Sequence, residues 1–350
     1  MSVKYTPVQW NTSKYGYDLV LVALVLVYVL GFLRIAPQFL EHARPVDGAI
    51  VRARAFGTCA FLMLTVILCI GPLARLDTRF LPLLYNRRHF GVLTAVVALS
   101  HAMFVLDWYF NFSPQSKLEG LLGANTNYTQ ILGFPFEIFG VFALLCLGIL
   151  AATSHDFWLS FLTPRVWKAL HFLIYPAYAA IIAHVGLGSL QSQGNQTFTV
   201  VVGVSAFLVA GLHAAAAWRE KQADRPAPLN GGWVDAGKAT AIPEGRARIV
   251  VLPDGDRVAV FRHKGKLSAI ANACAHQNGP LGEGRIIGGC VTCPWHGFQY
   301  RLADGRSPAP FTEMVPTYRL RIDGQTVLVD PDANAPGVFV EPVAIPGETA

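Results

Sequence analysis

Hydrophobic residues gather in six long runs before residue 219, and after it they occur in short runs separated by turns. A helix needs about 20 apolar residues to cross roughly 30 Å of hydrocarbon, and each long run is close to that length. Six such runs in succession favour membrane helices over the buried helices of a soluble protein. The sequence therefore predicts an α-helical membrane bundle of six transmembrane helices, over residues 17–35, 55–74, 90–106, 131–153, 169–187 and 197–218.

The segment between residues 233 and 330 has the pattern of a small all-β domain. Short β-branched runs such as ARIVVLP and TVLVD alternate with turn dipeptides such as Asp254-Gly255, which is typical of antiparallel strands joined by hairpins. The preceding stretch REKQADRPAPLNGG is charged and then rich in Pro and Gly, which indicates a linker. We expect four parts along the chain, namely a membrane domain at 1–218, a linker at 219–232, a β domain at 233–330 and an extended tail at 331–350.

Composition and charge agree with a protein embedded in membrane lipid. Apolar residues make up 53% of the chain and charged residues 14%, against about 25% charged in an average soluble domain. More Lys and Arg residues flank the helices on the side of the N-terminus than on the other side. Because cytoplasmic loops carry the basic excess, we expect a multi-pass protein of the cell inner membrane with both termini and the β domain in the cytoplasm. These bases account for most of the net charge of +6, so no nucleic-acid partner is needed to explain it.

Four candidate metal ligands stand in two pairs in the β domain. Cys274 and His276 enclose one residue, and Cys293 and His296 enclose two. A cytoplasmic face is reducing, so metal ligation is a better expectation for these cysteines than a disulfide. Two thiolates on one iron and two imidazoles on the other form the ligand set of a Rieske [2Fe-2S] cluster. A tetrahedral zinc site uses the same residue types and remains the alternative, although zinc sites more often use CxxC or HxxxH pairs.

The two ligand pairs also resemble a known family. Residues 231–330 are similar to a Rieske domain in both boxes, CAH at 274–276 and CPWHG at 293–297, and SPAP at 307–310 is similar to the proline loop that covers the cluster in that family. Phe298 stands where the Rieske proteins of quinol-oxidising complexes have Ser. The resemblance is therefore to the ferredoxin and oxygenase type, and it implies few hydrogen bonds to the cluster sulfurs and a potential in the lower part of the Rieske range.

Several histidines lie in or beside the apolar runs, where an ionisable residue is a candidate for function. A b-type haem iron takes one axial ligand from each of two facing helices. Counted from the basic helix ends at 1.5 Å per residue, His101 lies about 20 Å and His184 about 24 Å into the membrane, so these two are expected to hold one haem. His171 and His89 lie near the cytoplasmic end, where a second haem is possible, and His213 is expected to be structural.

Three stretches resemble the ferric-reductase-like transmembrane domain, above all the haem-binding membrane subunit of the bacterial periplasmic methionine-sulfoxide reductase system. They are GPLAR at 71–75, RRHFG at 87–91 with LSHAMF at 99–104, and WKALHFLIYPAYAAIIAH at 167–184. The resemblance covers about residues 15–220 and implies that His101, His171 and His184 are haem ligands. At the position of His89 the bacterial family usually has an apolar residue, so the role of His89 stays open.

The sequence has no GxGxxG after a strand and no Walker-type loop, which indicates that no flavin or nicotinamide domain is present. We therefore expect an oxidoreductase component of membrane electron transport. A soluble reductase or ferredoxin would supply electrons to the Rieske cluster, and b-type haem would deliver them to a periplasmic oxidoreductase or a quinone. Flow in the reverse direction uses the same parts.

Two further interpretations belong to other functional classes. The chain would be a redox sensor or regulatory module on a membrane anchor if its membrane histidines were structural. A Rieske oxygenase needs a mononuclear iron domain as well, and the β domain leaves no room for one.

Overall fold

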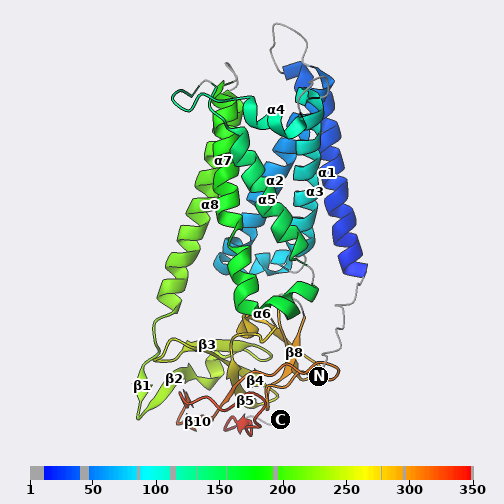
Figure 1. Cartoon of the computed structure of the whole chain (residues 1–350). Helices are drawn as coiled ribbons and strands as arrows, with labels where there is room; N and C mark the ends of the chain where they lie inside the picture. The colour runs from blue at the N-terminus through cyan, green and yellow to red at the C-terminus, as the bar shows by residue number, and fades with distance from the viewer. Residues whose placement is uncertain are drawn as a thin grey trace. The chain divides into compact units, whose positions relative to one another are not determined.

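The computed structural model describes residues 12–39, 47–84, 87–110, 116–131, 133–154, 156–191, 196–276, 278–294 and 297–347. The chain divides into two compact units, one formed by Met1–Arg75 and Asn86–Ala215 and the other by Leu76–Tyr85 and Ala216–Ala350. The first is helical, and the second contains the described strands (Figure 1). The predicted order of membrane helices followed by an all-β domain is confirmed.

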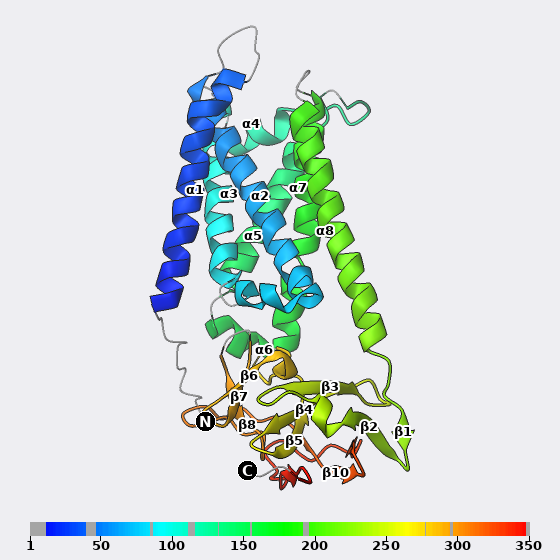
Figure 2. The ribbon, with the colours of Figure 1, turned by 180° about the vertical axis from the view of Figure 1, so that it is seen from behind.

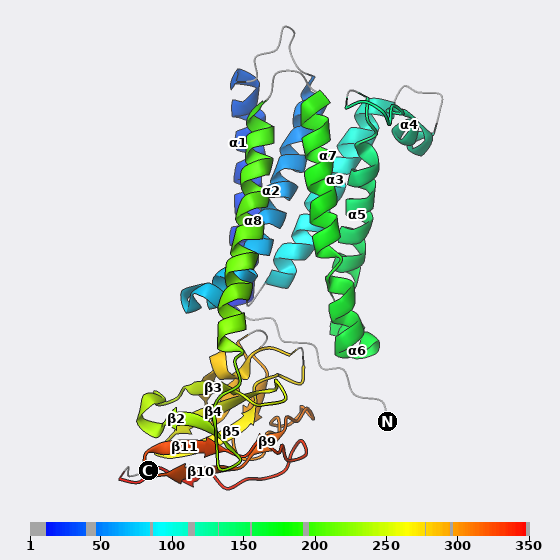
Figure 3. The same ribbon diagram turned by 90° about the vertical axis from the view of Figure 1, so that its left-hand side faces the viewer.

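The helical unit is a bundle in which long helices run side by side (Figures 1 and 3), with the short α4 across one end (Figure 2). α5 packs against both α3 and α7. The interior is centred on α2, where Leu64 is buried, whereas α1 exposes large apolar side chains such as Leu19 and Val27. Lipid tails are as apolar as these side chains, so such exposure has no cost in a bilayer. The helices are α1 Thr12–Phe39, α2 Gly48–Leu76, the 3₁₀ helix η1 Thr78–Leu84, α3 Arg87–Phe110, α4 Lys117–Gly123, α5 Glu137–Ala152, α6 Asp156–His171, α7 Ile174–Gln191 and α8 Gln196–Ala223.

The fourth apolar run forms a shorter helix than predicted. In place of a full span over 131–153, α5 contains 16 residues, which is about 24 Å at 1.5 Å per residue. Gly133 has a φ of 83°, and Pro135 disfavours a helical conformation at the residue before it, so the helix begins only after Pro135. Within the described residues, the six predicted spans are therefore corrected to one shorter apolar helix and five candidate spans. The five spans are Lys14–Ile35, Gly48–Leu76, Arg87–Trp108, Val166–Gly188 and Thr199–Gln222.

The fifth apolar run is interrupted between α6 and α7, at residues 172 and 173. Pro176 has no N–H to donate to the carbonyl of Phe172. That carbonyl accepts from the N–H of Tyr175 instead, at 3.1 Å. The interruption lies just before Pro176, the proline expected to kink this helix, and it separates His171 at the end of α6 from His184 on α7.

The β unit consists of antiparallel sheets in three groups. The strand orders are β1-β2-β11-β10, then β12-β5-β4-β3 with β9 against β5, and β6-β7-β8. The turn between β3 and β4 contains Gly255 at a φ of 92°, as the Asp-Gly dipeptide predicts. The strands are β1 Leu229–Asn230, β2 Trp233–Lys238, β3 Ala247–Val251, β4 Arg257–His263, β5 Lys266–Ala271, β6 Arg285–Ile287, β7 Cys290–Thr292, β8 Gln299–Arg301, β9 Thr317–Tyr318, β10 Leu320–Asp323, β11 Thr326–Val329 and β12 Val343–Ala344.

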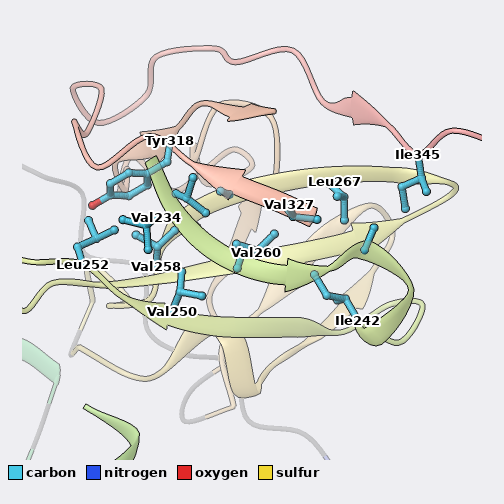
Figure 4. Close-up of a cluster of buried hydrophobic side chains, with 14 residues drawn as sticks. Val234, Ile242, Val250, Leu252, Val258, Val260, Leu267, Tyr318, Val327 and Ile345 are labelled. Carbon is cyan, nitrogen blue, oxygen red and sulfur yellow. The ribbon is translucent and has the colours of Figure 1, made fainter. Parts of the chain in front are cut away.

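Strand β4 separates two hydrophobic cores of the β unit. Successive side chains on a strand point to opposite faces. Val258 and Val260 therefore enter the core drawn in Figure 4, whereas Ala259 and Phe261 enter the other. This second core includes both cysteines predicted as cluster ligands, so the sheet supports the candidate site directly.

The segment expected as an extended tail contributes to the β unit. Val343–Ala344 forms β12, which pairs with β5. The next residue, Ile345, is 5% exposed and packs in the core of Figure 4. Burying one isoleucine side chain contributes about 1.5–3 kcal/mol, which holds this part of the chain against the sheet.

Candidate metal centres

Two turns of similar geometry carry the predicted cysteine ligands. Cys274 follows β5, Cys293 follows β7, and both side chains are buried. In each turn the carbonyl of the cysteine accepts a hydrogen bond from the residue four positions later, from Asn278 at 2.7 Å and from Gly297 at 3.0 Å. Asn278 and Gly297 have φ values of 58° and 77°, a region that Asn and Gly adopt at the lowest cost. The fold thus presents one buried sulfur from each of two tight turns.

An aromatic stack fixes the orientation of His276. Its ring lies on that of Phe298, with centroids 4.1 Å apart and planes at 12°. Phe311, which directly follows the SPAP stretch, contacts Phe298 at 5.0 Å between centroids. The stretch expected to cover the cluster is therefore next to a predicted ligand. The fourth predicted ligand, His296, lies outside the described residues.

Tyr300 is a candidate site residue that the sequence reasoning missed. It is fully buried, and its hydroxyl lies 3.3 Å from Cys274 Sγ. Burial, followed by the nearby Cys274, raises the pKa of Tyr300, so the phenol keeps its proton and can donate to a thiolate. The sequence predicted few hydrogen bonds to the cluster sulfurs, and the Tyr300 hydroxyl can supply at least one of them. The signal available in the sequence was a tyrosine four residues after His296.

The donors of the β unit fit a [2Fe-2S] cluster. None of the six cysteines is in a disulfide, so Cys274 and Cys293 can be thiolates, the form that binds iron. Among the described residues, no three His, Cys, Asp or Glu side chains are grouped as they would be around a single metal ion. A two-iron cluster takes its protein ligands two per iron, and His296 lies outside that search.

His101 and His184 are brought together inside the helical unit. The ring of His101 on α3 and that of His184 on α7 have centroids 6.3 Å apart and planes at 75°. An imidazole nitrogen binds a metal ion at about 2 Å, so this separation suits one ion between the two rings. An apolar groove of about 490 Å³, lined by α5 and α7, reaches Ala183 beside His184. The distance between the two rings therefore fits two ligands of a b-type haem iron.

Both rings have a defined tautomer. Nδ1 of His101 donates to the carbonyl of Ala53 at 2.8 Å, and Nδ1 of His184 donates to the carbonyl of Phe136 at 2.9 Å. A carbonyl only accepts, so each Nδ1 carries the proton and each Nε2 keeps its lone pair. Metal-binding histidines usually have this second hydrogen bond.

The remaining membrane histidines have different surroundings. Nδ1 of His171 donates to the carbonyl of Trp167 at 2.9 Å, and within the described part of the chain its buried Nε2 has no hydrogen-bond partner. His213 has Val209 O at 2.9 Å on one nitrogen and the Tyr175 hydroxyl at 3.4 Å on the other. His171 therefore keeps a nitrogen for a ligand, whereas both nitrogens of His213 are occupied.

His89, whose role the sequence left open, lies in the first turn of α3 and pairs with α1. Its Nδ1 is 2.8 Å from a carboxylate oxygen of Asp18. Ionisable residues in membrane helices usually pair with one another. It accounts for Asp18, one of the few charges within the apolar runs.

Comparisons with known proteins match both parts of the chain. Residues 232–319 match the Rieske [2Fe-2S] domain model, and residues 56–182 match the ferric reductase like transmembrane component. These are the two families that the sequence motifs resemble. With the apolar helices, they make the chain a multi-pass membrane protein with an oxidoreductase role in electron transfer.

Two relatives among characterised proteins match stretches of 99 and 103 residues. The ferredoxin component of the naphthalene 1,2-dioxygenase system of Pseudomonas aeruginosa is 32% identical over 99 residues, 28% of this chain and 94% of the ferredoxin. Cholesterol 7-desaturase nvd of Xenopus laevis is 31% identical over 103 residues, 29% of this chain and 22% of the desaturase. Among solved structures, the ferredoxin of carbazole 1,9a-dioxygenase from Nocardioides aromaticivorans IC177 aligns with 29% of this chain and 100% of its own, at 26% identity and a TM-score of 0.28. The chain thus spans nearly the whole naphthalene ferredoxin but only about a fifth of the desaturase.

Proposed function

We propose that this chain, whose β domain belongs to the Rieske [2Fe-2S] family and whose helices form a ferric reductase like transmembrane component, passes electrons between a Rieske cluster and b-type haem in the bilayer. A soluble reductase or ferredoxin is the donor, and a periplasmic oxidoreductase or a quinone is the acceptor. The observation that carries this proposal is the pair His101 and His184, 6.3 Å apart between ring centroids, each with Nε2 free to bind metal.

The ligands are assigned residue by residue. Cys274, His276, Cys293 and His296 hold the cluster. His101 and His184 hold one haem, and His171 is a ligand of a second. Both groups, when bound, supply one-electron centres. The chain contributes the buried thiols, the tautomer that leaves each Nε2 available, and the apolar helices that carry the pair.

The distribution of basic residues supports an inner-membrane location with the Rieske domain in the cytoplasm. In this arrangement the β domain is the point of electron entry, in place of a flavin domain. The proposed parts are the membrane domain at 1–218, the linker at 219–232 and the Rieske domain at 233–330.

The test is one redox titration of the detergent-purified chain, followed by optical spectroscopy and EPR. We expect reduced b-haem bands together with a rhombic Rieske signal, and His184→Ala should lose the haem held by His101 and His184 and keep the Rieske signal. A Rieske signal without haem in protein from haem-replete cells would reject the relay and favour the membrane-anchored redox sensor.

The direction of flow has its own test. A flavin reductase should reduce the cluster and then the haem bands. If reduced quinone analogues reduce the centres and a flavin reductase does not, electrons flow towards the cytoplasm.

A further inference from the structure

His101 and His184 each donate a hydrogen bond from Nδ1 to a backbone carbonyl outside their own helix. The acceptor of His101 is Ala53 on α2, and the acceptor of His184 is Phe136 at the start of α5. The two remaining histidines with a backbone acceptor among the described residues of the bundle, His171 and His213, donate to the carbonyl four residues earlier on their own helix. Among the described histidines of the bundle, a hydrogen bond to the backbone carbonyl of another helix is therefore specific to the pair proposed to bind haem.

A glycine stands four residues after each of these two acceptors, Gly57 after Ala53 and Gly140 after Phe136. Side chains on a helix tilt towards its N-terminus, so the side chain at position i+4 covers the carbonyl of position i. With glycine at that position the carbonyl stays open to a second donor. The histidine ring then occupies the space that a side chain would fill.

The space at both glycines is too small for any side chain. A Cβ on Gly57 would lie 2.8 Å from His101 Nδ1 and 2.9 Å from its Cε1. A Cβ on Gly140 would lie 2.9 Å from both His184 Nδ1 and its Cε1. These distances are shorter than the usual contact of about 3.5–4.0 Å between non-bonded carbon atoms. An alanine at either position would force the ring away from its carbonyl.

We propose that Gly57 and Gly140 are positioning residues that hold the two haem-ligating histidines against backbone carbonyls. Each glycine fixes the tautomer that presents Nε2 and the rotation of its ring, and together they set the two ring planes nearly perpendicular, at 75°. A hydrogen bond from Nδ1 also makes a ligand more basic, which favours the oxidised iron. This inference rests on the proposed function, because it assigns roles around the same histidine pair.

The test compares Gly57→Ala and Gly140→Ala with two control substitutions in the full-length chain. Gly148→Ala on α5 and Gly91→Ala on α3 are the controls, because a Cβ at either position meets no atom within 4 Å. Alanine is the better helix former at all four positions, so helix propensity predicts no damage. Haem per Rieske cluster, the ferric low-spin EPR spectrum and the haem midpoint potential are measured for each protein.

We expect both test variants to lose the haem held by His101 and His184 or, where they keep it, to show altered ferric EPR g-values and a raised potential of that haem. Both controls should match the wild type. The Rieske EPR signal and elution as a single detergent-bound species identify folded protein.

Three outcomes would overturn the proposal. Haem with wild-type EPR g-values and potential in both test variants would reject the role of the glycines and leave the electron relay intact. Aggregation of both test variants beside folded controls would show that the glycines serve helix packing. A wild-type chain without haem would reject the relay and this inference together.

Discussion

The hydroxyl of Tyr300 lies 3.3 Å from Cys274 Sγ, a sulfur proposed to bind the cluster. Tyr300→Phe keeps the ring and removes this donor. The O–H bond to sulfur is stronger in the reduced, more negative cluster, and a difference of about 1 kcal/mol corresponds to about 40 mV for a one-electron couple. We expect the midpoint potential of the cluster to fall by about this amount in an EPR-monitored titration.

Tyr318→Phe is the matched control for that experiment. Tyr318 is equally buried, and burial raises its pKa to about 12, but it packs in the other core of the β unit. Its substitution should leave the cluster potential unchanged. Equal shifts in both variants would assign the effect to packing and not to the hydrogen bond.

His171 and His213 differ in one respect that a substitution can measure. Nε2 of His171 is buried and has no hydrogen-bond partner within the described residues, whereas the Tyr175 hydroxyl lies 3.4 Å from Nε2 of His213. We expect His171→Ala to remove one of two haem components in the optical titration, and His213→Ala to keep both. An unchanged haem content in His171→Ala would make His171 a structural residue.

Among the elements, the short strand β12 is the one whose contribution the sequence concealed. Ile345 follows it and is 5% exposed in the core. Removing most of a buried isoleucine side chain costs about 2–5 kcal/mol. We therefore expect Ile345→Ala to lower the urea concentration at which the Rieske EPR signal of the full chain is lost.

Phe339→Ala provides the comparison for this element. Phe339 lies in the same segment but is 61% exposed, so its removal should leave the urea midpoint unchanged. Equal decreases of the urea midpoint in the two variants would mean that the stabilisation does not depend on the buried contact of Ile345.

Over the whole molecule, the orientation in the membrane can be tested with single cysteines. The native cysteines are buried, so an introduced exposed cysteine dominates labelling. Tyr128→Cys, in the loop before α5, should react with a membrane-impermeant maleimide in spheroplasts. Glu341→Cys, in the β unit, should react only in inverted vesicles. The opposite pattern would place the Rieske domain outside the cytoplasm.

Much of the fold and of the candidate site followed from local patterns. The apolar runs predicted the helices because hydrocarbon forces each spanning segment to be long and apolar. The spacing of Cys274, His276 and Cys293 predicted a cluster site because the chemistry requires those donor types at short intervals. The depth count paired His101 with His184, and their rings lie 6.3 Å apart between centroids in the structure.

The misses have two origins. The length of α5 depends on a local turn at Gly133 and Pro135 that a count of apolar residues does not detect, whereas β12 depends on a partner strand far earlier in the sequence. Tyr300 is a buried strand residue by pattern, and its role appears only when its hydroxyl is found beside Cys274.

The kinds of element, their order and the chemical types of the ligands were fixed by sequence, because hydrophobic periodicity and donor chemistry are local properties. The tertiary structure decided which carbonyls receive the histidines, which glycines leave room for them and which hydroxyl reaches a sulfur. These features depend on the packing of separate helices and strands to within an ångström, and such packing is a property of the whole fold.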